Sequence, residues 1–219
     1  MLQADGKAWL FAPNGLLDGP LPTHYEPGES PVTNALHGPR ASPTRRRYRR
    51  TDNPENPAGD TTVFPFVLTA SRLTEHYTAG GMTRWLPFLA ELQPELFVEV
   101  SPRLAAERGL RHNGWCHVIT SRTAVQAKVT VTERVQPLRV RGRTIHQVWM
   151  PYHFGGGGLA TGDVMNDLLG VIADPNVLIQ EGKATTCDVR PGKRPTGAAL
   201  LAYVEDYRRR AATSGGSRE

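Results

Sequence analysis

Cysteine is scarce in this chain, where Cys116 and Cys187 are the only two among 219 residues. Two cysteines are too few for a disulfide framework, and their spacing matches no common metal-binding pattern. Apolar residues never form a run of about 18 positions, so the sequence predicts no transmembrane helix. Met1 is followed by a polar segment, so we also expect no signal peptide and no direct insertion into a membrane.

The sequence argues against two kinds of site, a zinc site and a Ser-His-Asp hydrolase site. The side chains available for a zinc site are His112, Cys116, His117, His153 and Cys187. They include no Cys-x-x-Cys pair, and the neighbours Cys116 and His117 would point to opposite faces of a strand. A Ser-His-Asp hydrolase is disfavoured because the chain contains no Gly-x-Ser-x-Gly turn.

Positive charge is unevenly spread along the chain, whose net charge is +5. Six arginines lie between Arg40 and Arg50, a second basic cluster lies in residues 190–219, and the remainder is net negative. A nucleic-acid-binding protein carries its positive charge on a folded face, often with a helix-turn-helix, zinc-finger or RNA-recognition pattern. None of these patterns is present, so we expect no nucleic-acid partner and interpret the arginines as a solvated or subunit-facing patch.

Residues 1–62 are rich in proline, with nine of the eighteen prolines of the chain. This content excludes long helices and strands. Apolar residues such as Phe11, Leu16 and Tyr25 are nevertheless too frequent for a disordered linker. We therefore expect an extended arm that lies over a surface and ends in the arginine-rich loop.

Short strands and short helices are predicted for residues 63–190. Runs rich in β-branched and aromatic residues predict strands at 97–100, 115–120, 125–132, 144–150 and 185–190. Ser101 and Pro102 predict the start of a helix that ends at Gly109. Elements of this size favour a mixed α+β fold, mainly β and closed as a barrel, over a parallel sheet.

The tail, residues 191–219, is basic and contains one possible helix. Thr196 is a candidate cap for this helix. Its apolar face would consist of Leu200, Leu201, Val204 and Tyr207.

The stretch from Leu68 to Trp85 organises the rest of the chain. A buried strand is predicted up to Leu68, and hydrogen-bonding side chains then crowd the next nine positions: Thr69, Ser71, Arg72, Thr74, Glu75, His76 and Tyr77. Gly80 and Gly81 permit a turn, after which Thr83 is predicted to cap a helix. The apolar face of that helix would be Trp85, Leu86, Phe88, Leu89 and Leu92. A strand, a polar loop and a helix in this order are typical of a ligand-binding edge, although a plain surface loop is the alternative.

This stretch resembles the loop that opens the C-terminal, molybdopterin-dinucleotide-binding domain of formate dehydrogenase large subunits. The residues that carry the resemblance are Thr69, Arg72, His76, Tyr77, Met82, Thr83 and Arg84. Further phrases of the family recur in the same order: His24 to Pro27, Trp149 to Gly158, Met165 to Gly170, and Glu181 to Ala184. Residues 195–219 lie outside the resemblance.

The resemblance implies a double-psi β-barrel and a molybdopterin guanine dinucleotide with its molybdenum. The cofactor-binding residues that it implies are Thr69, Arg72, Leu73, Glu75, His76, Tyr77, His153, Asn166 and Lys183. Arg72 offers a planar fork to phosphate or pterin acceptors, Glu75 accepts from amino groups, and an Asn amide both donates and accepts. Each side chain also has a structural alternative, such as His153 packed on Phe154. Arg84 is expected to matter less if it points to solvent.

The resemblance also implies partners, because the iron–sulfur cluster and molybdenum ligands of such enzymes are missing from this chain. We expect the remainder of a formate dehydrogenase large subunit, which would carry them, and an iron–sulfur electron-transfer subunit. The chain alone should therefore not oxidise formate to carbon dioxide. A different class of function is a free-standing barrel that binds an acidic partner through its arginine-rich loop.

Overall fold

The computed structural model describes residues 4–8, 11–21, 23–32, 42, 44, 50–57, 61–182 and 184–215. Arg40 and the arginines at 45–47 and 49, on which the acidic-partner hypothesis depends, lie outside these residues, as does Lys183. Among the described residues, no helix is long and apolar enough to cross a membrane.

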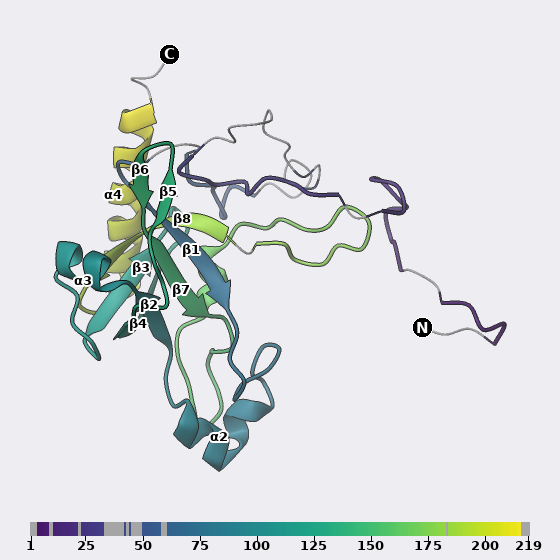
Figure 1. Ribbon diagram of the computed structural model, residues 1–219, viewed down its shortest axis with the longest axis horizontal. Helices are drawn as coiled ribbons and strands as arrows, with labels where there is room; N and C mark the ends of the chain where they lie inside the picture. Colours follow the sequence, from purple (N-terminus) through teal and green to yellow (C-terminus); the bar gives the residue numbers. More distant parts are fainter. Residues whose placement is uncertain are drawn as a thin grey trace.

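Six strands close into a barrel, which confirms the predicted fold class (Figure 1). In barrel order they are β1 (Phe66–Ser71), β7 (Gln147–Pro151), β2 (Phe97–Val100), β4 (Ala124–Val131), β3 (Trp115–Ile119) and β8 (Ala184–Pro191). The β1–β7 and β2–β4 pairs are parallel, and the other neighbours are antiparallel. The chain therefore crosses over between strands that are distant in sequence.

The core fills the barrel because alternate residues of each strand point inward. Leu68, Val98, Val129 and Val148 are completely buried and come from four different strands. The short helix α3 (Pro102–Arg108) covers one part of the barrel, and the Ser101 hydroxyl caps it by accepting from the Leu104 N–H at 3.1 Å. Gly109, in the left-handed region at φ 66°, ends it as predicted.

A second apolar cluster joins the C-terminal helix α4 (Gly197–Gly215) to the barrel. Val204, Tyr207 and Ala211 of α4 pack with Phe64 and Ile119. Leu201, placed on the apolar face by the sequence, is 73% exposed, because only one stripe of α4 meets the barrel.

Two details of the sequence prediction are wrong. Thr83 does not cap a helix, because it lies inside the 3-10 turn η1 (Thr83–Trp85), and α2 (Pro87–Leu92) begins only after Leu86. The strand predicted at 144–150 is divided at His146 into β6 (Arg143–Ile145), which pairs with β5 (Leu138–Val140), and β7. The 3-10 turn η2 (Met165–Leu168) follows β7.

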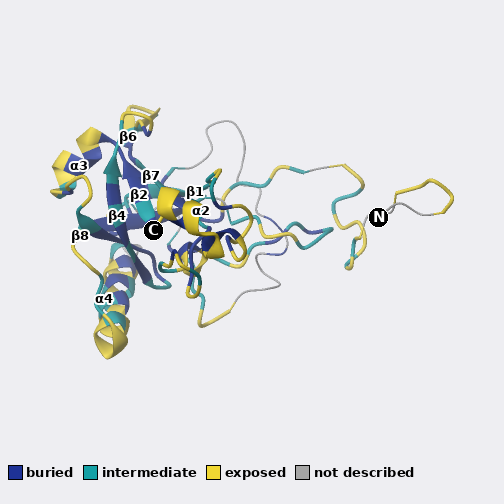
Figure 2. Ribbon diagram, turned by 90° about the horizontal axis from the view of Figure 1, so that it is seen from below, coloured by how far each residue is buried: buried dark blue, intermediate teal, exposed yellow. Residues whose placement is uncertain are grey.

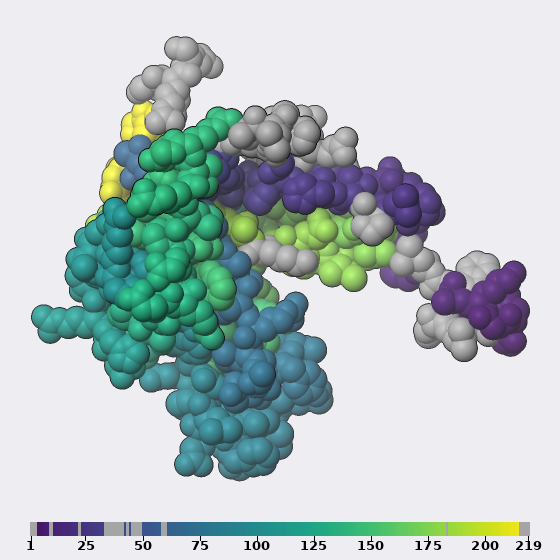
Figure 3. Space-filling view, in the orientation of Figure 1, coloured from purple at the N-terminus to yellow at the C-terminus, as the bar shows by residue number. Residues whose placement is uncertain are grey.

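The N-terminal arm runs away from the barrel beside the loop that precedes β8 (Figures 1 and 3). Its described residues 4–8, 11–21 and 23–32 contain no helix or extended strand. Asn176 of the neighbouring loop binds the arm twice, because its Nδ2 donates to the Gly19 carbonyl at 2.9 Å and its Oδ1 accepts from the Asp18 N–H at 3.2 Å.

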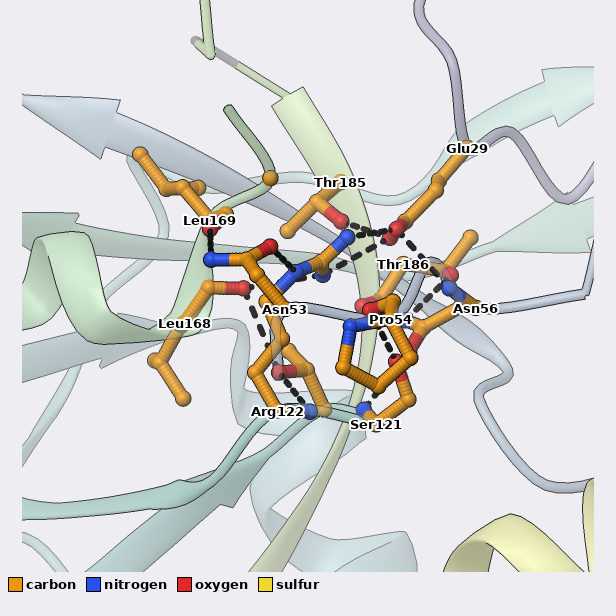
Figure 4. Close-up of polar contacts among 12 residues, drawn as sticks. Glu29, Asn53, Pro54, Asn56, Ser121, Arg122, Leu168, Leu169, Thr185 and Thr186 are labelled. Atoms are coloured by element: carbon orange, nitrogen blue, oxygen red, sulfur yellow. Dashed lines mark hydrogen bonds and ion pairs between the residues drawn. The ribbon is translucent and has the colours of Figure 1, made fainter. Parts of the chain in front are cut away.

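The arm is fastened to the barrel by a buried ion pair, Glu29–Arg122 (Figure 4). The two side chains are 4% and 3% exposed. The Glu29 carboxylate also accepts from the Asn56 N–H at 2.8 Å and from the Thr185 hydroxyl, while Arg122 Nε donates to Asn53 Oδ1 at 3.0 Å. A buried charge pair with its remaining groups hydrogen-bonded in this way fixes the arm in one position.

Candidate functional site

Two adjoining cavities form one groove beside the end of β1. The larger, about 570 Å³, lies between the loop Arg72–Glu75 and the strands β2 and β4; the smaller, about 220 Å³, reaches Thr69 and Trp149. The lining residues that both share are Arg72, Leu73, Phe97, Glu99 and Arg134. We call this joint space the barrel-edge groove.

The wall of the groove opposite the loop carries charge. Glu99, from β2, is 5% exposed, and Arg134 donates to both of its carboxylate oxygens, at 3.2 Å from Nε and through a shorter bond from a terminal nitrogen. Lys128 and Asn113 line the same wall. The indole Nε1 of Trp149 is buried, and no described group accepts its hydrogen. A buried N–H without a partner is uncommon and costs free energy unless something else accepts from it.

Arg72 lies at the rim of the groove and is exposed, yet its orientation is defined. Its guanidinium donates to the Tyr152 hydroxyl and lies 5.1 Å from the centre of the Tyr152 ring. The Tyr152 ring in turn packs on the His153 ring, with centroids 4.3 Å apart. Arg72 is therefore held by an aromatic side chain and retains further N–H groups for an anion or an acceptor.

His153 connects the two ends of the polar loop, Leu73 and Thr78, through its two ring nitrogens. Its Nε2 accepts from the Leu73 N–H at 2.9 Å, and its Nδ1 donates to the Thr78 carbonyl at 2.6 Å. Burial lowers the pKa of His153 below its usual value; the bond to Thr78 opposes this effect, and the positive charge of Arg72 adds to it. The imidazole is therefore neutral at pH 7 and fixes the loop by one donated and one accepted hydrogen bond.

His76 is completely buried and supports the same loop. Its Nε2 lies 2.9 Å from the Gln93 carbonyl, to which it donates, and its Nδ1 lies 3.3 Å from the Thr83 hydroxyl. The ring also meets Phe154 edge to face at 5.5 Å. Both histidines thus hold the loop by backbone and core contacts.

Arg84 is buried at 7% exposure and does not point to solvent. Its guanidinium donates to the carbonyls of Gly155 at 3.1 Å, Gly157 and Ala160 at 3.2 Å. Gly80 lies so close to the same loop that an added Cβ would be 2.1 Å from the His153 carbonyl oxygen. The glycine run is therefore packed against the turn before α2, and this contact requires glycine at position 80.

The structure brings together four of the residues that the sequence selected, because Thr69, Arg72, Leu73 and Glu75 all line the groove. The other selected residues have different positions. His76 and His153 lie beneath the loop, Tyr77 is 51% exposed beside Met82, and Asn166 is exposed on η2, outside the lining of the groove. Lys183 lies outside the described residues.

Sequence reasoning missed the opposite wall of the groove, where Glu99, Arg134 and Trp149 lie. One signal was available, since Glu99 is a carboxylate inside the otherwise apolar strand FVEV. Its pairing with Arg134 depends on the parallel β2–β4 register, in which Glu99 lies opposite Thr130 and the chain turns just beyond β4. This register is set by the barrel and cannot be read from the sequence.

Comparison with known proteins identifies the family of this chain. A family model described as a molydopterin dinucleotide binding domain matches residues 66–186. The chain is 35% identical to formate dehydrogenase 2 subunit alpha (cytochrome c-553) of Nitratidesulfovibrio vulgaris over 199 residues, 91% of this chain and 20% of that subunit. It is 37% identical to the nitrate-inducible formate dehydrogenase major subunit of Escherichia coli over 187 residues, 84% of this chain and 18% of the subunit.

Among solved structures, acetylene hydratase from Pelobacter acetylenicus matches with a TM-score of 0.46 and 12% identity, over 60% of this chain and 19% of that one. The chain spans about a fifth of the length of the formate dehydrogenase subunits that it matches. Because the family model covers the barrel from β1 into β8, the chain belongs to the molydopterin dinucleotide binding domain family.

Proposed function

We propose that this chain forms one wall of the site for molybdopterin guanine dinucleotide in the large subunit of a formate dehydrogenase. The observation that carries the proposal is the groove at the end of β1, where Thr69, Arg72, Leu73 and Glu75 meet. Family membership and the names of the relatives support the cofactor class and the reaction, the oxidation of formate to carbon dioxide.

The groove suits such a cofactor in size and chemistry. The larger cavity, about 570 Å³, lies within the range of about 300–1,000 Å³ that is typical of ligand sites. A pterin or guanine presents both donors and acceptors, and a pyrophosphate presents negative charge. The groove provides cations at Arg72, Lys128 and Arg134, a carboxylate at Glu75, and the aromatic side chain of Trp149.

Each group has a distinct part in holding the cofactor. Arg72 would direct its fork at phosphate or pterin oxygens, since guanidinium bonds to anions are short and strong. Glu75 would accept from an amino group. When bound, the cofactor supplies the metal-centred redox chemistry, while this chain binds it, orients it and excludes water.

The partners follow from the same proposal. We place the molybdenum ligand and the iron–sulfur cluster in the part of the large subunit that corresponds to the remaining length of the relatives. An iron–sulfur electron-transfer subunit would carry the electrons onward. On this account the 219-residue chain alone binds one side of the cofactor and catalyses nothing.

Replacement of Arg72 tests the proposal. A charge-assisted hydrogen bond contributes about 1.5–3 kcal/mol, so Arg72→Ala should weaken cofactor retention roughly ten- to a hundredfold. The matched control is Arg139→Ala, because Arg139 is exposed on β5 and away from the groove lining. Guanine nucleotide and molybdenum would be measured in the purified complex; full retention in Arg72→Ala would show that the loop has only a structural role.

A further inference from the structure

The segment around α2 exposes an unusual amount of apolar surface. In the ribbon views α2 lies beyond one end of the barrel strands and is coloured largely as exposed (Figures 1 and 2). The exposed apolar side chains here are Tyr77, Met82, Trp85, Leu86, Phe88, Leu92 and Leu159. We call this set the apolar cap. The sequence assigned most of it to the apolar face of a helix, and in the structure this face is open: Trp85 is 60% and Phe88 64% exposed.

The composition of the apolar cap is that of a protein interface. Fully buried aromatic residues bury about 150–250 Å² each, so the three exposed rings alone present on the order of 350 Å². The aliphatic residues extend the area beyond the few hundred Å² that a typical monomer exposes in one patch. Between Tyr77 and Leu92 the only charged residues are Arg84, which is buried, and Glu91. Interface cores show the same enrichment in aromatic residues and methionine with few charges.

The cap is also rigidly supported. Arg84 fastens η1 to three backbone carbonyls of the loop Gly155–Ala160, and the Leu159 N–H donates to the Arg84 carbonyl at 2.8 Å. His76 is bonded on both ring nitrogens beneath the cap. A surface ordered before association loses less conformational entropy when it binds. Because these exposed apolar residues are held in place, we interpret them as a surface for a permanent contact and not as part of a flexible loop.

The apolar cap is continuous with the barrel-edge groove. Leu92 belongs to the cap and also lines the larger cavity, and Tyr77 lies two residues after Glu75, which lines the same cavity. A body that closes the open side of the groove over a cofactor therefore reaches the cap as well. The relatives contain about four fifths of their length beyond the matched region, which is ample for such a body.

We propose that the apolar cap is the docking surface for the part of the large subunit that holds the other face of the cofactor. This proposal rests on the proposed function. The occupant is an apolar, uncharged surface of the polypeptide region that carries the molybdenum ligand, on the same or on a separate chain. Docking there would exclude water from the groove and bury Trp85 and Phe88 at its edge.

Site-directed photocrosslinking in the assembled enzyme tests this contact. Phe88 would be replaced by p-benzoyl-phenylalanine, and the complex would be isolated through a tag on this chain and irradiated. Met82 provides a second position on the cap, 65% exposed, in case the first substitution disturbs folding. Leu201, 73% exposed on α4, is the matched control. Mass spectrometry of the crosslinked peptides identifies the region that is reached.

The expected result is that both cap positions crosslink to the region bearing the molybdenum ligand, while position 201 does not. In parallel, Phe88→Asp should lower recovery of that region with the tagged domain by about tenfold or more when the two are on separate chains, and Leu201→Asp should not. Crosslinks to a second copy of this chain, to the electron-transfer subunit, or to nothing would overturn the proposal.

Guanine nucleotide in the same preparations separates this proposal from the proposed function. A complex that contains the nucleotide but gives no cap crosslinks to the metal-bearing region would refute the docking surface alone. A complex with these crosslinks but without guanine nucleotide or molybdenum would refute the cofactor assignment and leave the contact standing.

Discussion

At the scale of single residues, His153 determines the shape of the polar loop more directly than any side chain that lines the groove. It connects Leu73 and Thr78 through opposite ring nitrogens, which requires a neutral imidazole with its hydrogen on Nδ1. Protonation would add a hydrogen to Nε2, and this hydrogen would face the Leu73 N–H donor. The loop therefore depends on a group that burial keeps uncharged.

The stability of the protein should accordingly fall on acidification. The folded pKa of His153 is lower than the unfolded value of about 6.5, so the unfolded state binds more protons below that pH. The contribution of His153 is complete above pH 6.5 and is lost as the pH falls toward its folded pKa. His153→Gln should flatten this acid limb of a urea-unfolding series between about pH 7 and 5. His24→Gln, at an exposed position, is the control, and an unchanged acid limb in His153→Gln would contradict the assignment.

At the scale of elements, the sequence predicted helix and strand boundaries that depend on neighbouring residues, but not the contacts between distant segments. The helix α3 was predicted to within a residue because Ser101, Pro102 and Gly109 act on their own neighbours. The hydrophobic pattern around α2 identified apolar residues but could not tell whether the covering surface belongs to this barrel or to another body. The crossover connections and the Glu99–Arg134 pair depend on strand register, which distant segments set together.

For the N-terminal arm as well, the sequence predicted the local conformation but not the long-range contact. An extended, proline-rich course was predicted from composition, whereas the ion pair that fastens it was not, because Glu29 and Arg122 are 93 residues apart. The boundary between arm and barrel at residues 62 and 63 stays a prediction. Glu29 accepts hydrogen bonds from Thr185 of β8 and from Asn56. We therefore expect the end of the arm to contribute to the stability of the barrel.

Removal of one partner of this pair should be costly. Glu29→Gln leaves Arg122 buried without its counter-charge, and such changes typically destabilise by about 3–5 kcal/mol. The measurement is the midpoint of urea unfolding followed by circular dichroism. The control is Asp52→Asn, which removes an exposed partner of Arg50 and should leave the midpoint unchanged. An equally small effect in Glu29→Gln would show that the arm does not contribute to the stability of the barrel.

At the scale of the whole molecule, the barrel core encloses both thiols. Cys116 and Cys187 are completely buried on β3 and β8, and burial raises the pKa of Cys116 to about 12 and that of Cys187 above its usual value. Thiolates are the reactive form, so both cysteines should resist a thiol reagent at pH 8 in the folded protein. Both should become reactive together at the urea concentration where circular dichroism reports unfolding. Rapid labelling of either thiol in the native protein would contradict a closed barrel.

The central claim is that the barrel-edge groove holds the cofactor, and hydrogen–deuterium exchange tests it most directly. The complete enzyme would be compared as isolated and as produced in cells that cannot make molybdopterin guanine dinucleotide. We expect slower exchange with cofactor in peptides from both walls of the groove, residues 69–75 and 128–134, and equal exchange in α4. Equal exchange of the groove peptides in the two preparations, with guanine nucleotide present only in the first, would contradict the account.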